Sequence, residues 1–188
     1  MGRPLVSAFL ALSLDGFIAG PDGDLAWLDA YATDSIQETG YAGLMHRIDT
    51  LVMGRNTHEK LLSFDPWPYP ERRVVVLTHR PFAARHGESA EAGPLGEVLH
   101  RLWQQGARHV YLDGGDVVRQ GLADGLVDEL TLSWVPVILG AGISLFGGLR
   151  HPSSWQAGDV RRLPSGLIQA VYRPYPPGAG HHAPGTAT

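Results

Sequence analysis

Hydrophobic residues occur along the chain in short runs separated by turn residues, and two kinds of spacing alternate. Three mostly apolar runs, Leu5–Leu14, Thr50–Gly54 and Arg73–Thr78, predict buried strands. The segments between them carry apolar residues three and four positions apart, which is typical of amphipathic helices. Strands that alternate with helices predict right-handed crossovers and a mainly parallel sheet, so the pattern indicates the α/β class.

Helix boundaries follow from residues that cap or break helices. Ser35 and Glu38 form a capping box that predicts a helix start, and Thr57 is placed to cap the segment His58–Leu62. A third helix is expected between Pro94, at its first position, and Gly106, just past its end. A fourth follows a glycine pair and is marked by Val117, Val118, Leu122 and Leu126.

The second half of the chain adds further strands. A run from Val110 ends at the glycine pair, Asp128–Leu139 alternates at first, and Trp155–Arg162 and Leu167–Arg173 form an antiparallel hairpin. Ala83–Gly93 and Leu139–Phe146 are expected to be loops. We therefore expect one domain over residues 1–174 and a disordered tail, rich in Pro, Gly and His, over residues 175–188.

The glycine pair Gly114-Gly115 stands between a strand and a helix. Glycine has no Cβ and lets a backbone approach a ligand closely, and the free amides of a following helix favour an anion such as a pyrophosphate. Gly54 and Thr78 end two other strands. Because the carboxyl ends of parallel strands meet at one edge of a sheet, these positions together predict a nucleotide site.

Composition narrows the choice of function. The 188 residues are 44% hydrophobic and 18% charged with a net charge of −4, which is typical of a globular chain and disfavours nucleic-acid partners. No cysteine is present, so disulfides and thiolate chemistry are excluded, and no metal motif is complete because Leu62 replaces the second His after His58-Glu59. No run reaches the roughly 18 residues of a membrane span, and Asp15-Gly16 interrupts the first run, so a cytoplasmic protein is expected.

Five motifs occur in the order found in the dihydrofolate-reductase-like superfamily: Ser13–Ala19, Val52–Thr57, Val74–Arg80, Leu112–Gly115 and Pro136–Gly142. Within it, the chain most resembles the reductase (RibD C-terminal) domain of bacterial riboflavin biosynthesis, as a stand-alone member. The resemblance implies a three-layer fold with a mixed, mainly parallel sheet of about eight strands, a C-terminal antiparallel hairpin and helices on both faces. It also implies NADPH as cofactor and a homodimer.

The resemblance further implies which residues bind the cofactor. One group would hold the cofactor phosphates, a second the adenosine ribose and its 2′-phosphate, and a third the pyrophosphate and nicotinamide; a guanidinium suits the 2′-phosphate by charge and geometry. The residues for the cofactor phosphates are Gly54, Arg55 and Thr57, and those for the adenosine ribose and its 2′-phosphate are Thr78, His79 and Arg80. Those for the pyrophosphate and nicotinamide are Gly114, Gly115, Asp116 and Val117. Further contacts are expected from Ala8, Ile18 and Leu77.

On the substrate side, Asp15 at the end of the first strand is the candidate for substrate contact or proton delivery. Phe64 and Asp65 resemble part of an Asp-Pro motif that touches substrate in the riboflavin branch. Trp27 and Asp29 fall near the positions where folate reductases place an aromatic residue and an acid. The chain departs from the riboflavin pattern where that branch has cations, because Phe9 and Phe17 occupy those positions.

Three functions remain open on the sequence. The family-implied activity is reduction of 5-amino-6-(5-phosphoribosylamino)uracil, the second is reduction of dihydrofolate or another pterin-like substrate, and the third is dinucleotide binding without catalysis. Two acids beside the glycine pair do not suit a phosphate site. We expect Asp116 to cap the helix and Asp113 to contact a ribose hydroxyl or the turn.

Overall fold

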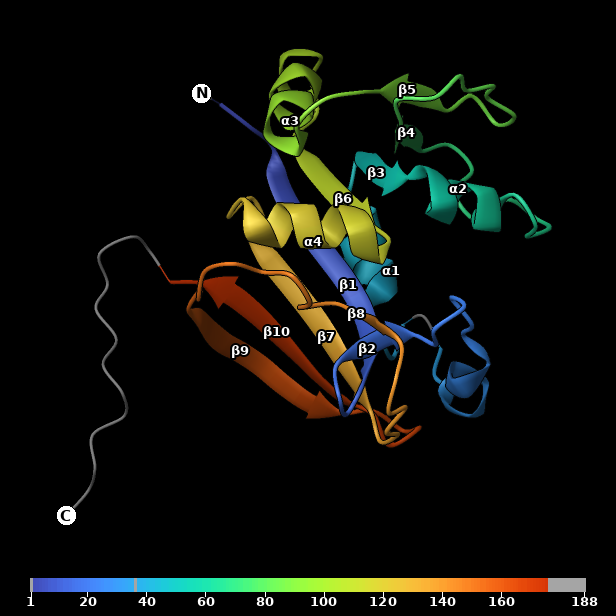
Figure 1. The fold of residues 1–188 in the computed structure, drawn as a ribbon, viewed down its shortest axis with the longest axis vertical. Coiled ribbons are helices and arrows are strands. Elements are labelled where there is room, and N and C mark those ends of the chain that lie inside the picture. Colours follow the sequence, from blue (N-terminus) through green and yellow to red (C-terminus); the bar gives the residue numbers. More distant parts are fainter. Residues whose placement is uncertain (1, 36, 176–188) are drawn as a thin grey trace.

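The computed structural model describes residues 2–35 and 37–175, in which one eight-stranded sheet forms the centre (Figure 1). Its strand order is β5-β4-β3-β6-β1-β7-β10-β9. The first six strands in this order are parallel, and β10 runs antiparallel to both β7 and β9. The strands are β1 (Leu5–Ser13), β3 (Thr50–Gly54), β4 (Arg73–Leu77), β5 (Ser89–Glu91), β6 (His109–Asp113), β7 (Glu129–Val135), β9 (Trp155–Arg162) and β10 (Ile168–Pro174).

Helices cover both faces of this sheet, as expected (Figure 1). The described helices are the 3₁₀ helix η1 (Ala26–Tyr31), α1 (Tyr41–Arg47), α2 (Arg55–Leu61), α3 (Leu95–Gln104) and α4 (Gly115–Ala123). The α3 and α4 helices lie against one face, and α1 lies behind it (Figure 1). A small second sheet, β2 (Phe17–Ala19) with β8 (Ile143–Ser144), lies beside the end of β1.

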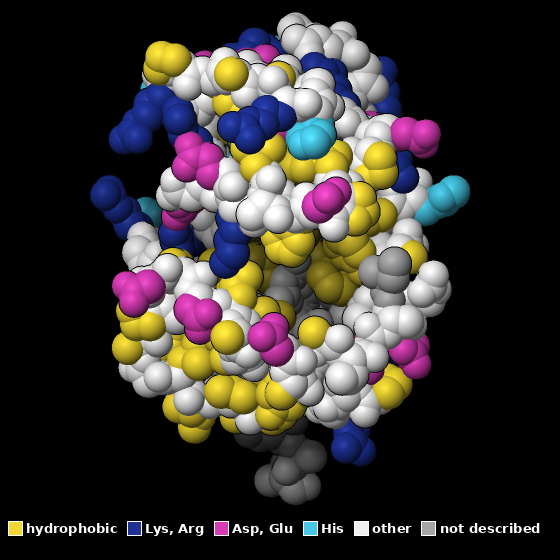
Figure 2. All heavy atoms as spheres, turned by 90° about the vertical axis from the view of Figure 1, so that its right-hand side faces the viewer, with side chains coloured by type: hydrophobic (Ala, Val, Ile, Leu, Met, Phe, Trp, Pro, Cys, Tyr) yellow, Lys and Arg dark blue, Asp and Glu magenta, His cyan; other side chains and the backbone are white. Residues whose placement is uncertain are grey.

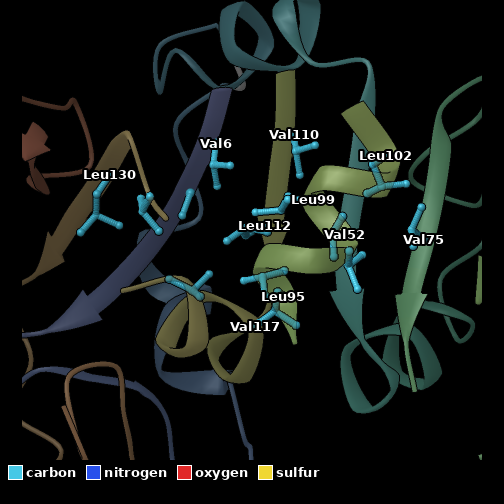
Figure 3. Packing of buried hydrophobic residues seen from close by; sticks show 14 of the residues in the cluster. Val6, Val52, Val75, Leu95, Leu99, Leu102, Val110, Leu112, Val117 and Leu130 are labelled. Carbon is cyan, nitrogen blue, oxygen red and sulfur yellow. The ribbon is translucent and has the colours of Figure 1, made fainter. Parts of the chain in front are cut away.

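Buried strand residues alternate between two cores. Val52 faces the α3 and α4 side, whereas its neighbours Leu51 and Met53 face α1. Figure 3 shows the larger core, in which Leu99 of α3 and Val117 of α4 point toward the strands. Side chains on both faces explain why the parallel strands read as continuous apolar runs rather than as alternating ones.

The structure corrects several expected boundaries. The range 83–93 contains the edge strand β5, and 139–146 contains β8, so neither is wholly a loop. The box of Ser35 and Glu38 forms both of its hydrogen bonds, but it closes a turn, and α1 begins only at Tyr41. Thr57 lies inside α2, because that helix begins at Arg55. Short polar segments with few apolar residues carry too weak a period to mark such boundaries.

Of the other expected ends, that of α3 is confirmed and that of β7 is corrected. Gly106 lies just past α3 in the positive-φ region, as the predicted helix end requires. The strand expected over 128–139 is shorter, and it ends before Pro136, which cannot donate to the ladder. The tail predicted over 175–188 lies outside the described residues apart from Tyr175. Within 2–35 and 37–175, the longest apolar helix is too short to cross a bilayer.

Candidate active site

A cavity of about 420 Å³ opens at the carboxyl ends of β3 and β6, a size usual for small-molecule sites. Figure 2 shows a hollow with mostly hydrophobic walls and charged side chains around its mouth. Its walls come from strand ends, from α2 and from the segment between β2 and η1. The lining residues are Phe9, Leu10, Ala11, Ile18, Ala19, Gly23, Leu25, Leu28, Asn56, Thr57, Lys60, Leu61, Phe64, Tyr69, Asp113, Gly114, Gly115, Asp116 and Ile143.

The glycine pair forms part of this wall because larger residues do not fit there. Gly114 has φ +94°, and a Cβ on it would collide with the Thr57 hydroxyl. A Cβ on Gly115 would collide with the Ile18 side chain. The α4 helix begins at Gly115, so its first amides, which lack partners within the helix, lie at the cavity. The Thr57 and Ile18 side chains therefore explain why both positions are glycine, and the approach of a ligand to this backbone stays a prediction.

We expect Gly114→Ala to destabilise the fold by about 2–4 kcal/mol, because a positive φ and a collision with Thr57 act together. The matched control is Gly16→Ala, since Gly16 has φ +82° but its Cβ would meet nothing within 4 Å. That variant should cost only about 1–2 kcal/mol. Urea unfolding measures both, and equal losses would show that the contact with Thr57 is unimportant.

At the floor of the cavity, Asp113 accepts a 2.8 Å hydrogen bond from the Tyr69 hydroxyl. Burial raises the pKa of the Asp113 carboxyl, and the bonds from Tyr69 and from the Gly114 backbone only partly oppose this. Burial likewise raises the pKa of Tyr69 far above its ordinary value, so this hydroxyl stays neutral. A carboxyl group that is held in place and has a raised pKa is suited to deliver a proton within an apolar site.

The other acid beside the glycine pair is neutralised by a cation that the sequence analysis overlooked. Asp116 makes a short ion pair with Arg119, one turn further along α4. Arg119 also donates to the Ser144 carbonyl at 2.7 Å, which ties α4 to β8. Asp116 makes no side-chain cap on α4, so its expected capping role is wrong. The i, i+3 spacing of Asp116 and Arg119 was the available signal for this pair.

The residues expected around the adenosine end lie on neighbouring strand ends. Gly54 of β3 pairs with Leu77 of β4, which brings Arg55 close to the segment that follows Leu77. Arg55 bonds Glu59 at 2.6 Å and the Pro81 carbonyl at 3.1 Å. The Thr78 hydroxyl accepts from the Arg80 amide, whereas the side chains of His79 and Arg80 are exposed. The structure therefore groups these residues at one edge, and their contact with a cofactor stays a prediction.

Beneath that edge, a buried pair joins α2 to the loop between β4 and β5. Nε2 of His58 lies 2.8 Å from Glu88, and the backbone amides of Arg85 and His86 donate to the other Glu88 oxygen. Burial alone would raise the pKa of Glu88, but these hydrogen bonds outweigh it and lower that pKa to about 2. Sequence reasoning missed this pair because its partners are 30 positions apart.

Asp15 lies outside the lining of the cavity. Its exposed carboxylate accepts from the Ser13 hydroxyl and from the amides of Leu139 and Gly140. These bonds, that from Ser13 first, lower the pKa of Asp15. Asp15 thereby fastens the β1–β2 turn to the segment after β7, and its contact with substrate stays a prediction.

The other predicted substrate residues are divided between the rim and the surroundings. Phe64 lines the cavity, whereas Asp65 and Asp29 are exposed and do not line it. Trp27 packs with Val135, beside the cavity. Ala8 and Val117, two of the expected cofactor contacts, are buried in the core below. Tyr69 was missed, because its Pro-rich loop gives no periodic signal.

Fold and site together define an α/β protein with a cavity at the carboxyl ends of its parallel strands. The sequence profile of the RibD C-terminal domain matches residues 4–169, and the chain belongs to this family. The chain is 31% identical over 147 residues to the uncharacterised protein YwjB of Bacillus subtilis, which covers 76% of this chain and 83% of YwjB. It is also 31% identical over 169 residues to the riboflavin biosynthesis protein RibD of Corynebacterium ammoniagenes, covering 80% of this chain but 47% of RibD.

Solved structures agree with this assignment. A protein provisionally assigned to riboflavin biosynthesis, from Shewanella sp. PV-4, superposes with a TM-score of 0.83 at 34% identity, covering 90% of this chain and 98% of the other. Dihydrofolate reductase from Enterococcus faecalis, solved with NADP(H) and the ligand RAB-propyl, gives a TM-score of 0.61 at 20% identity, and the match covers 92% of this chain and 97% of the other. The fold is therefore dihydrofolate-reductase-like, and the family supports an oxidoreductase.

Proposed function

We propose that the protein is an NADPH-dependent reductase of a small heterocyclic substrate. The observation that carries this proposal is the position of Asp113, a held acid at the floor of an apolar cavity, directly beside a glycine turn that opens a helix. Acid and glycine turn supply the two parts that a hydride-transfer site needs, a proton source and a backbone cradle for a dinucleotide.

The residues present fit such a dinucleotide. Gly114 and Gly115 line the cavity without side chains of their own, and the amides at the start of α4 suit a pyrophosphate. The charge of Asp116 is balanced by Arg119, which removes the objection to an acid near a phosphate. Arg80 is exposed at the end of β4, where it would meet a 2′-phosphate.

When bound, NADPH supplies the hydride to a carbon of the substrate. The protein's own part is to hold the ring between the apolar walls and to deliver a proton to the nitrogen or oxygen that gains negative character. Asp113 in its acid form can give that proton. Tyr69 keeps the carboxyl group pointing into the cavity.

Two substrates remain as candidates. Reduction of 5-amino-6-(5-phosphoribosylamino)uracil is implied by the family, and the RibD of Corynebacterium ammoniagenes carries riboflavin biosynthesis in its name. A pterin-like substrate is favoured by the lining, in which Lys60 is the cation and its Nζ already donates to the Gly23 carbonyl at 3.0 Å. A phosphorylated substrate would require Lys60 to exchange this bond for the phosphate.

Cofactor preference gives a test that needs no substrate. NADPH at a hundred times its dissociation constant should stabilise the fold by about 2.7 kcal/mol and raise the melting temperature, and NADH should do so less. Arg80→Ala should remove the difference between the two cofactors, because a guanidinium binds the 2′-phosphate. Scanning calorimetry with each cofactor measures this.

The matched control for that test is Arg85→Ala. Arg85 lies on the same exposed loop, but its recorded contact with Glu88 is made by the backbone amide, which the substitution keeps. This variant should retain the preference for NADPH. Equal shifts for NADPH and NADH in the unaltered protein would refute the 2′-phosphate assignment.

A homodimer, which the family resemblance implies, also remains a proposal. It is supported by a second apolar groove on the α4 side of the sheet, between β7 and the β8–β9 segment. Phe146, which is 40% exposed, lies in this groove together with Trp134 and Trp155. An apolar surface of this kind suits a contact between two copies.

A further inference from the structure

A line of phenol groups leads away from the floor of the cavity. The Tyr69 hydroxyl lies 2.8 Å from Asp113 and 3.4 Å from the hydroxyl of Tyr41, the first residue of α1. Tyr69 is 9% exposed, and Tyr41 is half-buried. Three groups from β6, from the 62–72 segment and from α1 thus form one hydrogen-bonded row.

The direction of donation along this row of hydrogen bonds is fixed while Asp113 is ionised. A carboxylate only accepts, so the Tyr69 hydroxyl must donate to it, and its oxygen is then free to accept from Tyr41. Burial raises the pKa of both tyrosines, so both hydroxyl groups keep their protons at neutral pH. Because bonds in a row polarise one another, Tyr41 strengthens the bond that Tyr69 makes to Asp113.

We propose that Tyr69 is the positioning residue of Asp113, and that Tyr41 supports it, so that this hydroxyl pair orients the carboxyl group and controls when it carries a proton. The proposal rests on the reductase function proposed above only for its catalytic consequence. The row itself belongs to the protein without any ligand.

Among the described residues, Tyr69 is the side chain that bonds Asp113, and the Gly114 amide is its backbone partner. The charged side chains that share the cavity with it are Lys60, bound to the Gly23 carbonyl, and Asp116, paired with Arg119. Tyr111 lies in the same aromatic cluster, where its hydroxyl donates to the Phe9 carbonyl at 3.2 Å and interacts with the hydroxyl of Tyr41, but it makes no hydrogen bond to Asp113. Tyr111 therefore provides a matched control for the removal of a hydroxyl group from this cluster.

The first experiment follows the carboxyl ¹³C resonance of Asp113 through a pH titration of the ligand-free protein, with the resonance assigned by its absence in Asp113→Asn. Tyr69→Phe should raise the pKa of Asp113, because a bond to its charged form is lost. Tyr41→Phe should raise it less, and Tyr111→Phe should change it least, because the Tyr111 hydroxyl bonds neither Asp113 nor Tyr69. An unchanged titration in Tyr69→Phe, or an equal shift in all three variants, would overturn the proposal.

The second experiment adds turnover, with NADPH and whichever heterocycle the unaltered protein reduces. Tyr69→Phe should lower kcat about tenfold or more at low pH with an unchanged KM, and its falling limb should move to higher pH. A rise in KM alone would show a substrate contact instead and contradict the positioning role. If no heterocycle is reduced, the proposed function fails, while the titration still decides the role of Tyr69.

Discussion

Asp113→Asn should lower kcat for NADPH oxidation by about 10²–10³ while leaving the fold and cofactor binding intact. The amide cannot give a proton, and general acids contribute rate factors of about this size. The folded state should not lose stability, because burial disfavours the charge of this carboxyl, as its raised pKa shows. Stopped-flow absorbance of NADPH measures the chemical step, and the NADPH-induced melting shift reports binding.

The pH dependence of the unaltered enzyme follows from the same group. In the proposed mechanism Asp113 acts in its acid form, so kcat should fall as the pH rises through its raised pKa. Asp116→Asn is the matched control, since Asp116 lines the same cavity but pairs with Arg119. It should keep kcat within about threefold, as expected for an exposed pair. Full activity in Asp113→Asn would exclude Asp113 as the proton donor.

Glu88→Ala should destabilise the protein by about 3–5 kcal/mol at pH 7, the largest stability effect that we expect of a single polar side chain here. The substitution leaves the buried His58 ring and the amides of Arg85 and His86 without their acceptor. Urea unfolding measures the loss. Glu91→Ala is the matched control, because the Glu91–Arg101 pair is partly exposed and should contribute less than about 1 kcal/mol.

The loss in Glu88→Ala should itself depend on pH. The pKa of Glu88 is about 2 in the folded protein, below its ordinary value of 4.5. Its stabilising contribution is therefore complete above about pH 4.5 and disappears as the pH falls toward 2. The unfolding free energies of the variant and the unaltered protein should converge over that range. A difference that stays constant down to pH 2 would show that the charge of Glu88 is unimportant.

Most of the architecture could be predicted because strands that are buried on both faces appear in the sequence as unbroken apolar runs. Leu51, Val52 and Met53 are all fully buried, so β3 reads as an unbroken apolar run that identifies a central parallel strand. The edge strand β5 carries Ser89 and Glu91 and is largely exposed, so nothing in its composition separates it from a loop. Short strands with a solvent-exposed face cannot be identified from the periodicity of apolar positions.

The site could be predicted only in part, for a related reason. The glycine turn is local, so Gly114 and Gly115 could be identified from adjacent residues and lie at the cavity. The partners of Asp113 are not local, since Tyr69 is 44 positions away along the chain. A carboxyl next to a glycine pair looks like a turn residue until the tertiary contact that buries it is known. Whether such an acid is surface or active site depends on packing, which single positions do not encode.

Two side-chain hydrogen bonds, from Lys60 to the Gly23 carbonyl and from Arg119 to the Ser144 carbonyl, bear on how the ligand specificity of this fold can change. Both bonds connect the strand-end half of the cavity, with α2 and α4, to segments outside the main sheet. The 19–28 segment and β8 contribute walls of the cavity without contributing to the eight-stranded ladder. Replacing the 19–28 segment by that of another family member should therefore change which ligands the cavity accepts, while the eight-stranded ladder stays intact.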